Sequence, residues 1–346
     1  MISQTPSVQR RDFLKASCVA VGTASLAVAS EGAAEPRPAA APIPTRQFGK
    51  TGHVLPILGM GSSPLVALWA PGYGAEPGSV EKRAALVRQA YDRGVRYFDT
   101  ARVYYDAERV MGQGLAGVRG NCFVATKVAV SAPALVRKSV EKSLQELRMD
   151  RVELVQIHSP AIEKVGFEGA MKIHAELVKL RGEGLFRFIG LTTHVAFETV
   201  AKMIATGGFD QVLLAYGYFR KGMDTLLSER NLKFREMCLA KAHQQKMAVV
   251  AMKVMGAAVL GRMSARVVPD YDPRERAKLP AAAMRWALDD PRVSLLAIGM
   301  GHAEEIEQNA VILASDLTLT DKDRSLLKDY SARAYQSERF KKMRVV

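Results

Sequence analysis

The sequence predicts an α/β fold, a closed (β/α)8 barrel of parallel strands, and three observations lead to it. Eight short runs that favour strands follow one another, and a longer amphipathic stretch comes after most of them. No composition shift divides residues 46–346, so we expect one domain there. No Gly-x-Gly-x-x-Gly follows the first run, which argues against the alternative, an open doubly wound sheet that binds a dinucleotide.

Strands and helices are expected to alternate along this domain. The strands are expected over residues 57–60, 96–99, 122–127, 152–158, 186–191, 211–215, 247–252 and 294–298. Helices are expected where apolar residues recur three and four positions apart, over 79–93, 132–147, 167–180, 196–204, 229–245 and 280–289. Parallel neighbours need a crossover of a dozen or more residues, and the helical stretches supply it.

The first 29 residues have the pattern of an export signal. Arg10 and Arg11 are followed by a weakly apolar run over residues 16–29. That run has 14 residues, fewer than the ~20 that a membrane-spanning helix needs. The segment 1–29 therefore resembles a twin-arginine signal peptide that is cleaved after Ala29. An uncleaved tail or an interfacial helix is the alternative.

This resemblance implies a destination and a partner. The partner is the twin-arginine translocation machinery, and the mature protein is expected to be periplasmic or secreted, with no stable membrane insertion after cleavage. Residues 30–45 are rich in Ala and Pro and are expected to form a linker. The folded domain is then expected over residues 46–346.

Composition excludes several classes of function. The 346 residues include 49 Lys and Arg against 35 Asp and Glu, a net charge of +14. The basic residues are spread along helical stretches without interleaved aromatic residues, so we expect no nucleic-acid partner. Three cysteines occur without a Cys-x-x-Cys or a Cys/His cluster, which argues against a disulfide framework and a metal site. The chemistry is therefore expected from other side chains or from an organic cofactor.

Polar side chains come at the ends of three consecutive strands. Asp99 ends the second strand, with Tyr104 in the loop beyond it; Lys127 ends the third strand and His158 the fourth. The carboxyl ends of barrel strands surround one shared mouth, where active sites lie. We therefore expect an acid, a phenol, an ammonium group and an imidazole to converge there.

These four groups suit a tyrosine that exchanges a proton. A tyrosine phenol ordinarily has a pKa of about 10, and a nearby cation lowers that pKa. Lys127 is expected to supply the cation, Asp99 to hold the lysine, and His158 to hydrogen-bond a substrate oxygen. Such a site protonates a carbonyl oxygen, or takes a proton from an alcohol, during hydride transfer. A structural role, such as a helix cap for Asp99 or a core position for His158, is the alternative for each residue.

The sequence resembles the aldo-keto reductase family over residues 46 to about 314. The stretches that carry the resemblance are 46–52, 58–61, 98–112, 125–127, 139–147, 154–160, 188–192 and 299–309. The resemblance implies an N-terminal β-hairpin, a C-terminal helix, and a catalytic tetrad of Asp99, Tyr104, Lys127 and His158. It also implies an oxidoreductase that moves hydride between NADP or NAD and a small-molecule carbonyl/alcohol substrate, with Tyr104 as general acid/base.

The resemblance also implies which residues bind the cofactor. They are Gly61, Ser62, Thr192, Thr193, Met252, Lys253, Gly299, Met300, Gln308 and Asn309. Many relatives have Ser-Asn where this chain has Thr192 and Thr193, and a tyrosine where it has Met252. Lys253 and Arg262, on the loop after the seventh strand, are candidates for contact with the pyrophosphate.

The residues expected at the adenosine end of the cofactor leave the choice between NAD and NADP open. Relatives that are specific for NADPH often carry Lys or Arg in the segment 299–305, because a 2′-phosphate favours a fixed cation. In that segment this chain has His302 together with the acidic Glu304 and Glu305. NAD therefore stays open beside NADP.

Export and a nicotinamide cofactor constrain each other. A bacterial envelope space is not expected to hold a free nicotinamide pool, so an exported enzyme that released its cofactor at each turnover would stop. We therefore hypothesise a tightly retained cofactor that a second substrate regenerates, with ping-pong kinetics. The alternatives are an ordinary cytoplasmic reductase and a nucleotide-binding regulatory or binding module with little turnover on the same fold.

Overall fold

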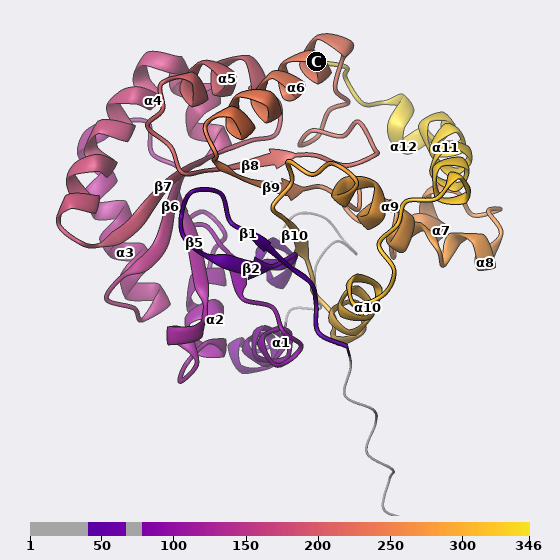
Figure 1. Cartoon of the computed structure of the whole chain (residues 1–346), viewed down its shortest axis with the longest axis horizontal. Helices are drawn as coiled ribbons and strands as arrows, with labels where there is room; N and C mark the ends of the chain where they lie inside the picture. The colour runs from indigo at the N-terminus through magenta and orange to yellow at the C-terminus, as the bar shows by residue number, and fades with distance from the viewer. Residues whose placement is uncertain (1–40, 67–77) are drawn as a thin grey trace, which may run out of the picture. The chain divides into compact units, whose positions relative to one another are not determined.

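Eight parallel strands close into a barrel, in the order β10-β3-β4-β5-β6-β7-β8-β9 (Figure 1). The structure is a computed structural model that describes residues 41–66 and 78–346. The barrel strands are β3 (Leu58–Gly61), β4 (Tyr97–Asp99), β5 (Phe123–Val128), β6 (Val152–Ile157), β7 (Phe186–Thr193), β8 (Gln211–Ala215), β9 (Ala248–Met252) and β10 (Leu295–Gly299). Each strand begins and ends within two residues of its expected range, so the predicted fold class is confirmed.

The N-terminal predictions cannot be compared with this structure. The signal peptide expected at 1–29 and most of the linker expected at 30–45 lie outside the described residues. Those assignments, and the domain bounds drawn from them, stay predictions. Within the described residues, no helix is both long enough and apolar enough to cross a membrane.

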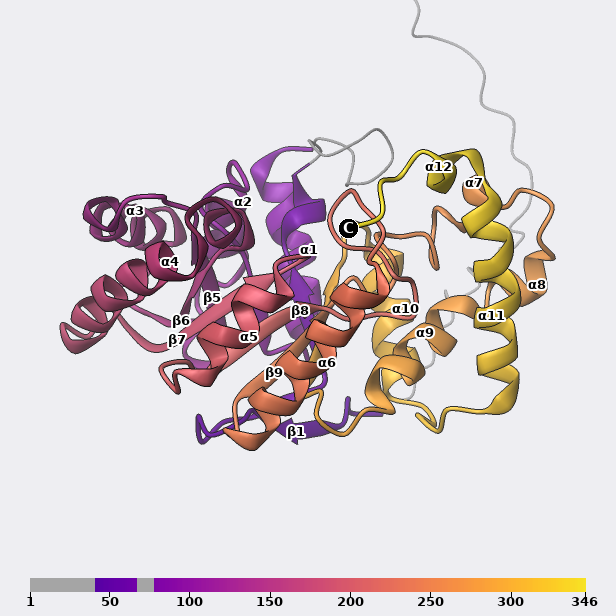
Figure 2. The same ribbon diagram turned by 90° about the horizontal axis from the view of Figure 1, so that it is seen from above.

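Helices surround the barrel strands (Figures 1 and 2). They are α1 (Val80–Asp92), α2 (Ala107–Gly114), α3 (Val136–Leu147), α4 (Ser159–Gly182), α5 (Phe197–Ala205), α6 (Glu229–Gln244), α7 (Ser264–Val267), α8 (Pro273–Arg276), α9 (Leu279–Leu288), α10 (Ala303–Leu313), α11 (Asp321–Gln336) and α12 (Glu338–Lys341). The expected C-terminal helix is α11, which begins with reciprocal capping between Thr320 and Asp323. Ser79 caps α1, and its side chain accepts a hydrogen bond from the Lys82 N–H.

Helix α4 begins earlier than its periodicity predicts. The expected start is residue 167, whereas the helix starts at Ser159, with Pro160 in its first turn. Gly166 has a φ of 64° and interrupts the helical geometry, so the first turns form a separate short helix. Because Gly lacks a Cβ, it adopts this backbone conformation without steric cost. The early start leaves His158 at the N-cap position of α4.

A hairpin closes the amino-terminal end of the barrel. Strands β1 (Thr45–Gln47) and β2 (Val54–Pro56) pair antiparallel, as the family resemblance implies. Phe48, in the turn between them, is fully buried against Tyr97 and Phe123, with ring centroids 5.5 and 4.9 Å away. These rings form one cluster with apolar side chains of β6, β8, β9 and β10 inside the barrel. The amino-terminal end is therefore packed core, and the opposite end is left for chemistry.

Candidate active site

The four residues expected to form the tetrad lie together at the carboxyl ends of β4, β5 and β6. Asp99 is the last residue of β4 and Lys127 lies one residue before the end of β5. His158 follows β6 directly, and Tyr104 lies in the loop between β4 and α2. The parallel register brings these strand ends to the same level, pairing Asp99 with Ala125 and Lys127 with Gln156.

A buried ion pair forms the base of this cluster. The Lys127 ammonium group donates to the Asp99 carboxylate, and also to the Thr100 carbonyl at 2.7 Å. The other Asp99 oxygen accepts from the Gln156 side-chain amide at 2.8 Å. Lys127 and Asp99 are almost inaccessible to solvent, at 1% and 5% exposure. A buried lysine with two acceptors stays in one orientation, with its ammonium group 5.1 Å from the centre of the Tyr104 ring.

Burial sets the direction in which the pKa of Tyr104 shifts. Burial first, and then the Asp99 carboxylate, raise the pKa of the Tyr104 phenol above its ordinary value. The expected lowering by Lys127 is not found, because the Asp99 carboxylate that pairs with the lysine acts on the phenol in the opposite direction. At neutral pH Tyr104 is a protonated phenol, which is the form that donates a proton.

His158 is kept neutral beside this phenol. Burial first, and then the charge of Lys127, lower the pKa of His158 well below its ordinary value. Its ring meets the Tyr104 ring edge to face, with centroids 5.7 Å apart. The Nδ1 atom is buried and has no hydrogen-bond partner among the described residues. A neutral imidazole offers one N–H donor and one acceptor to a ligand oxygen.

A cavity of about 1070 Å³ opens above this cluster. Asp99, Tyr104 and His158 line it, together with seven of the expected cofactor residues: Gly61, Ser62, Met252, Lys253, Gly299, Gln308 and Asn309. Its volume lies at the upper end of the range for cavities that hold organic ligands. The Ser62 hydroxyl is buried without a partner among the described residues, as expected of a group that awaits a polar ligand.

Three of the expected cofactor residues do not line the cavity. Thr192, Thr193 and Met300 are buried, at 1%, 0% and 0% exposure. The Thr192 hydroxyl accepts from the Ser159 N–H at 2.9 Å, so it fixes the first turn of α4 next to His158. Thr192 therefore supports the tetrad in this structure, rather than presenting its hydroxyl to a ligand.

At the far end of the cavity, Arg262 joins the loop after β9 to the start of α10. Its guanidinium lies 3.2 Å from the His302 ring nitrogen and 3.2 Å from the Glu305 carboxylate. The same carboxylate accepts from the Gly301 N–H at 2.8 Å. Arg262 and the Gly301 N–H are the groups that a phosphate would need at this end, and both already bind Glu305.

The structure also adds residues that sequence reasoning missed. Gln156 holds Asp99, and His194 and Lys221 line the cavity. Strand alternation could have found Gln156, which lies two positions before His158 and so faces the same side. Lys221 lies on the loop after β8, where the strand-end rule also applies. Among the described residues, no group of three or more His, Cys, Asp or Glu could hold a metal ion.

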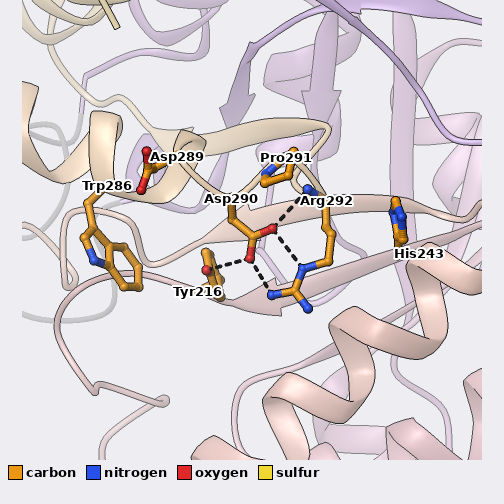
Figure 3. Close-up of a pocket in the computed structure, with 7 residues that line it drawn as sticks. All are labelled: Tyr216, His243, Trp286, Asp289, Asp290, Pro291 and Arg292. Atoms are coloured by element: carbon orange, nitrogen blue, oxygen red, sulfur yellow. Dashed lines mark hydrogen bonds and ion pairs between the residues drawn. The ribbon is translucent and has the colours of Figure 1, made fainter. Parts of the chain in front are cut away.

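A second pocket, of about 550 Å³, has no tetrad residue in its lining. Figure 3 shows the residues that line it. At its centre the Asp290 carboxylate accepts from the Tyr216 hydroxyl at 3.0 Å and from Arg292 at 2.7 and 2.9 Å. Although burial raises the pKa of Asp290, these bonds hold it below its usual value. A carboxylate with so many donors ties the loop after α9 to the end of β8, so we assign it a structural role.

The chain is a (β/α)8 barrel with a protonated tyrosine at its mouth. Residues 65–280 match the model of the Aldo/keto reductase family. The chain therefore belongs to the aldo/keto reductase family.

Named relatives agree with this assignment. The chain is 25% identical over 324 residues to L-galactose dehydrogenase of Arabidopsis thaliana, covering 84% of this chain and 94% of that protein. It is 33% identical over 123 residues to methylglyoxal reductase DkgA of Yersinia pestis, covering 35% of this chain and 43% of that protein.

Solved structures show the same fold. Aldo-keto reductase AKR11C1 from Bacillus halodurans, in its holo form, has a TM-score of 0.65 at 19% identity, covering 83% of this chain and 96% of that chain. An aldo-keto reductase from Klebsiella pneumoniae in complex with NADPH has a TM-score of 0.63 at 21% identity, covering 83% and 94%.

Proposed function

We propose that this protein is an NAD(P)-dependent oxidoreductase that transfers hydride between a nicotinamide and a carbonyl/alcohol substrate, with Tyr104 as general acid/base. The observation that carries the proposal is the buried Lys127–Asp99 pair beneath two groups that line the cavity, Tyr104 and His158. A proton donor and a neutral imidazole side by side can bind one substrate oxygen from two directions. The large cavity beside them has room for a dinucleotide and a small substrate.

The cofactor is assigned to the cavity wall from β3 to α10. Ser62, Met252, Gly299, Gln308 and Asn309 line that wall and are proposed to hold it. When bound, a nicotinamide supplies the hydride that converts a carbonyl carbon to an alcohol. The relative from Klebsiella pneumoniae binds NADPH, which supports a nicotinamide dinucleotide here.

The chain's own residues handle the proton and the substrate oxygen. In the direction of reduction, Tyr104 Oη donates its proton to the substrate oxygen, and in oxidation the phenolate takes it back. His158 hydrogen-bonds the same oxygen and so fixes the position of the carbonyl group. Asp99 holds the Lys127 ammonium group 5.1 Å from the centre of the Tyr104 ring, so the phenol lies against a fixed cluster.

Glu305 bears on the choice between the two cofactors. It already pairs with Arg262 and with the Gly301 N–H, so a 2′-phosphate at this end would meet a carboxylate. The Glu305 carboxylate and the 2′-phosphate would repel each other at short range, and both would compete for Arg262. We therefore expect NAD to bind at least as tightly as NADP.

Export and retention of the cofactor are part of the same proposal. The twin-arginine pattern in residues 1–29 supports an exported, periplasmic or secreted protein. Arg262 joins the loop after β9 to α10 along the cavity wall, which supports slow release of a dinucleotide. We propose that the cofactor stays bound while two carbonyl/alcohol pairs exchange hydride in turn. Ordered kinetics with free exchange of nucleotide would contradict this mechanism.

Replacing Tyr104 by phenylalanine tests the proposed reaction. Tyr104→Phe keeps the ring and removes the proton, so carbonyl reduction should fall by about a hundred- to ten-thousand-fold. The affinity for the nucleotide, measured by calorimetric titration, should stay unchanged. Tyr105→Phe is the matched control, because Tyr105 lies in the same loop and its side chain is 61% exposed.

Two results would argue against the reaction. Full activity in Tyr104→Phe would show that another group supplies the proton. Binding of nucleotide by the unaltered protein without turnover of any carbonyl or alcohol would favour the alternative, a nucleotide-binding module on the same fold.

A further inference from the structure

Among the nitrogen-bearing side chains that line the cavity are three on neighbouring loops that have no part in the proposed reaction. They are His194 on the loop after β7, Lys221 on the loop after β8, and Lys253 directly after β9. Tyr104 and His158 line the same cavity. Three neighbouring loops therefore bring basic groups to the mouth where the substrate oxygen is expected.

Close backbone contacts fix these loops relative to one another. A Cβ added at Gly222 would lie 2.6 Å from the Val195 side chain and 3.0 Å from the His194 carbonyl. A Cβ added at Gly217 would lie 2.6 Å from the Lys253 carbonyl. Both positions need glycine because the loop after β8 touches its two neighbours directly.

The loop after β8 is also held by the end of the chain. Lys221 forms a bridge with Leu226 across a tight turn, and Leu226 forms another with Val345. Figure 2 shows the C-terminus beside this loop. The Lys221 ammonium group donates to the Met223 carbonyl, which further fixes the side chain. The three basic groups thus belong to a rigid arrangement rather than to mobile surface loops.

The charges in this arrangement are unbalanced. The ammonium group of Lys253 has no hydrogen-bond partner among the described residues, and the charges that act on it are Lys221 and Asp224. Burial first, and then Lys221, lower the pKa of Lys253 to about 8, against the opposing effect of Asp224. His194 is neutral, because burial and then Lys253 lower its pKa well below the ordinary value. Two ammonium groups are therefore opposed by the charge of one carboxylate, Asp224.

We propose that Lys253, Lys221 and His194 form an anion-binding subsite beside the tetrad, so that the substrate is a carbonyl or alcohol compound that also carries a carboxylate or phosphate. Lys253 is a half-buried cation without a hydrogen-bond acceptor among the described residues, and an anionic substrate group supplies one. His194 Nδ1, also buried without a partner among the described residues, is a further polar atom for that group. This inference rests on the proposed function and names its substrate class.

The pyrophosphate of the cofactor is the other anion that could use Lys253. The charged groups that act on the subsite place it nearer to the substrate than to the pyrophosphate. The charge of Lys253 acts on His194, and so does the charge of Lys127 in the tetrad. The cation that we assign to the adenosine end is Arg262, which is held by Glu305 and His302.

A matched pair of aldehydes tests the subsite. 4-Oxobutanoate carries a carboxylate and butanal does not, while glyceraldehyde 3-phosphate and glyceraldehyde form the same comparison for phosphate. The preference, measured as the ratio of kcat/KM for the charged over the neutral aldehyde, should fall about ten- to a hundred-fold in Lys253→Met. Lys253→Arg should keep the preference, and Lys233→Met, at an exposed position of α6, should leave it unchanged.

The pH dependence of this preference is a second readout. Lys253 faces Lys221, Asp224 and His194, and its ammonium form is required to bind the anion. The preference should therefore be present below about pH 8 and fall as the pH rises further. In Lys253→Met the fall should disappear, which a merely structural role would not produce.

Three results would overturn the subsite, and each differs from a failure of the proposed function. The first is an equal loss of kcat/KM for both aldehydes in Lys253→Met. The second is weaker nucleotide binding in that variant without a change in preference, which would assign Lys253 to the pyrophosphate. The third is calorimetry in which succinate, which needs no turnover, fails to bind the nucleotide-loaded protein. Absence of nucleotide binding in the unaltered protein would instead contradict the proposed function itself.

Discussion

Asp99 shows how the neighbours of one residue set the properties of a site. One of its oxygens pairs with Lys127 and the other accepts from Gln156, so the carboxylate is fully used inside the barrel. Lys127 does not lower the pKa of Tyr104, because burial first, and then the Asp99 carboxylate, raise that pKa. The sequence could name these residues from their positions at strand ends. It could not show the direction of the pKa shift, which depends on burial in three dimensions.

Gln156 provides a test at the scale of single residues. Gln156→Leu removes the donor from Asp99 and leaves a buried carboxylate oxygen unsatisfied, so the free energy of unfolding should fall by about 1–3 kcal/mol. The pH profile of kcat should also shift, because Asp99, whose charge raises the pKa of Tyr104, then loses a hydrogen-bond donor. Urea denaturation and the pH profile measure the two effects.

Gln211 is the matched control for this test. It is a fully buried glutamine of the barrel, and both polar atoms of its side chain lack partners among the described residues. Gln211→Leu should therefore leave stability unchanged or raise it, because no hydrogen bond is lost. Equal destabilisation by the two substitutions would show that the bond to Asp99 is unimportant.

At the scale of elements, the strands were predictable and the start of α4 was not. Short apolar runs identify the eight strands because parallel barrel strands are buried on both faces. The start of α4 was missed because Gly166 interrupts the helical pattern, although Pro160 suits a first turn. The contact of Gly222 with the loop after β7 is likewise absent from any local pattern. Long-range packing of loops therefore had to come from the structure.

The hairpin gives a prediction about stability. Phe48 is fully buried and packs on Tyr97 and Phe123, so Phe48→Ala should lower the free energy of unfolding by about 3–5 kcal/mol. The turnover of the folded fraction should not change, because the hairpin lies at the end of the barrel opposite the tetrad. Val54→Ala, at a 58% exposed position of β2, should change stability by no more than about 0.5 kcal/mol. Similar urea midpoints for the two variants would contradict a closing role for Phe48.

At the scale of the whole molecule, one end of the barrel is packed and the other carries the chemistry. The barrel fold is shared with structures below 25% identity, so the fold tolerates wide changes of sequence. The net charge of +14 agrees with a preference for anionic ligands such as a dinucleotide and an acidic substrate. The proposed export signal lies outside the described residues, so it rests on the sequence pattern of residues 1–29.

The most direct test of the central claim, that the cavity holds a nicotinamide dinucleotide over the tetrad, is the nucleotide bound by the protein itself. The protein is purified from the exported fraction and denatured, and the released nucleotide is identified by mass spectrometry; emptied protein is titrated with NAD and NADP. We expect about one NAD or NADP per chain, with NAD bound at least as tightly. Recovery of the protein only from the cytoplasm would contradict export. Protein that releases neither nucleotide and binds neither in titration would contradict the assignment as a nicotinamide-dependent oxidoreductase.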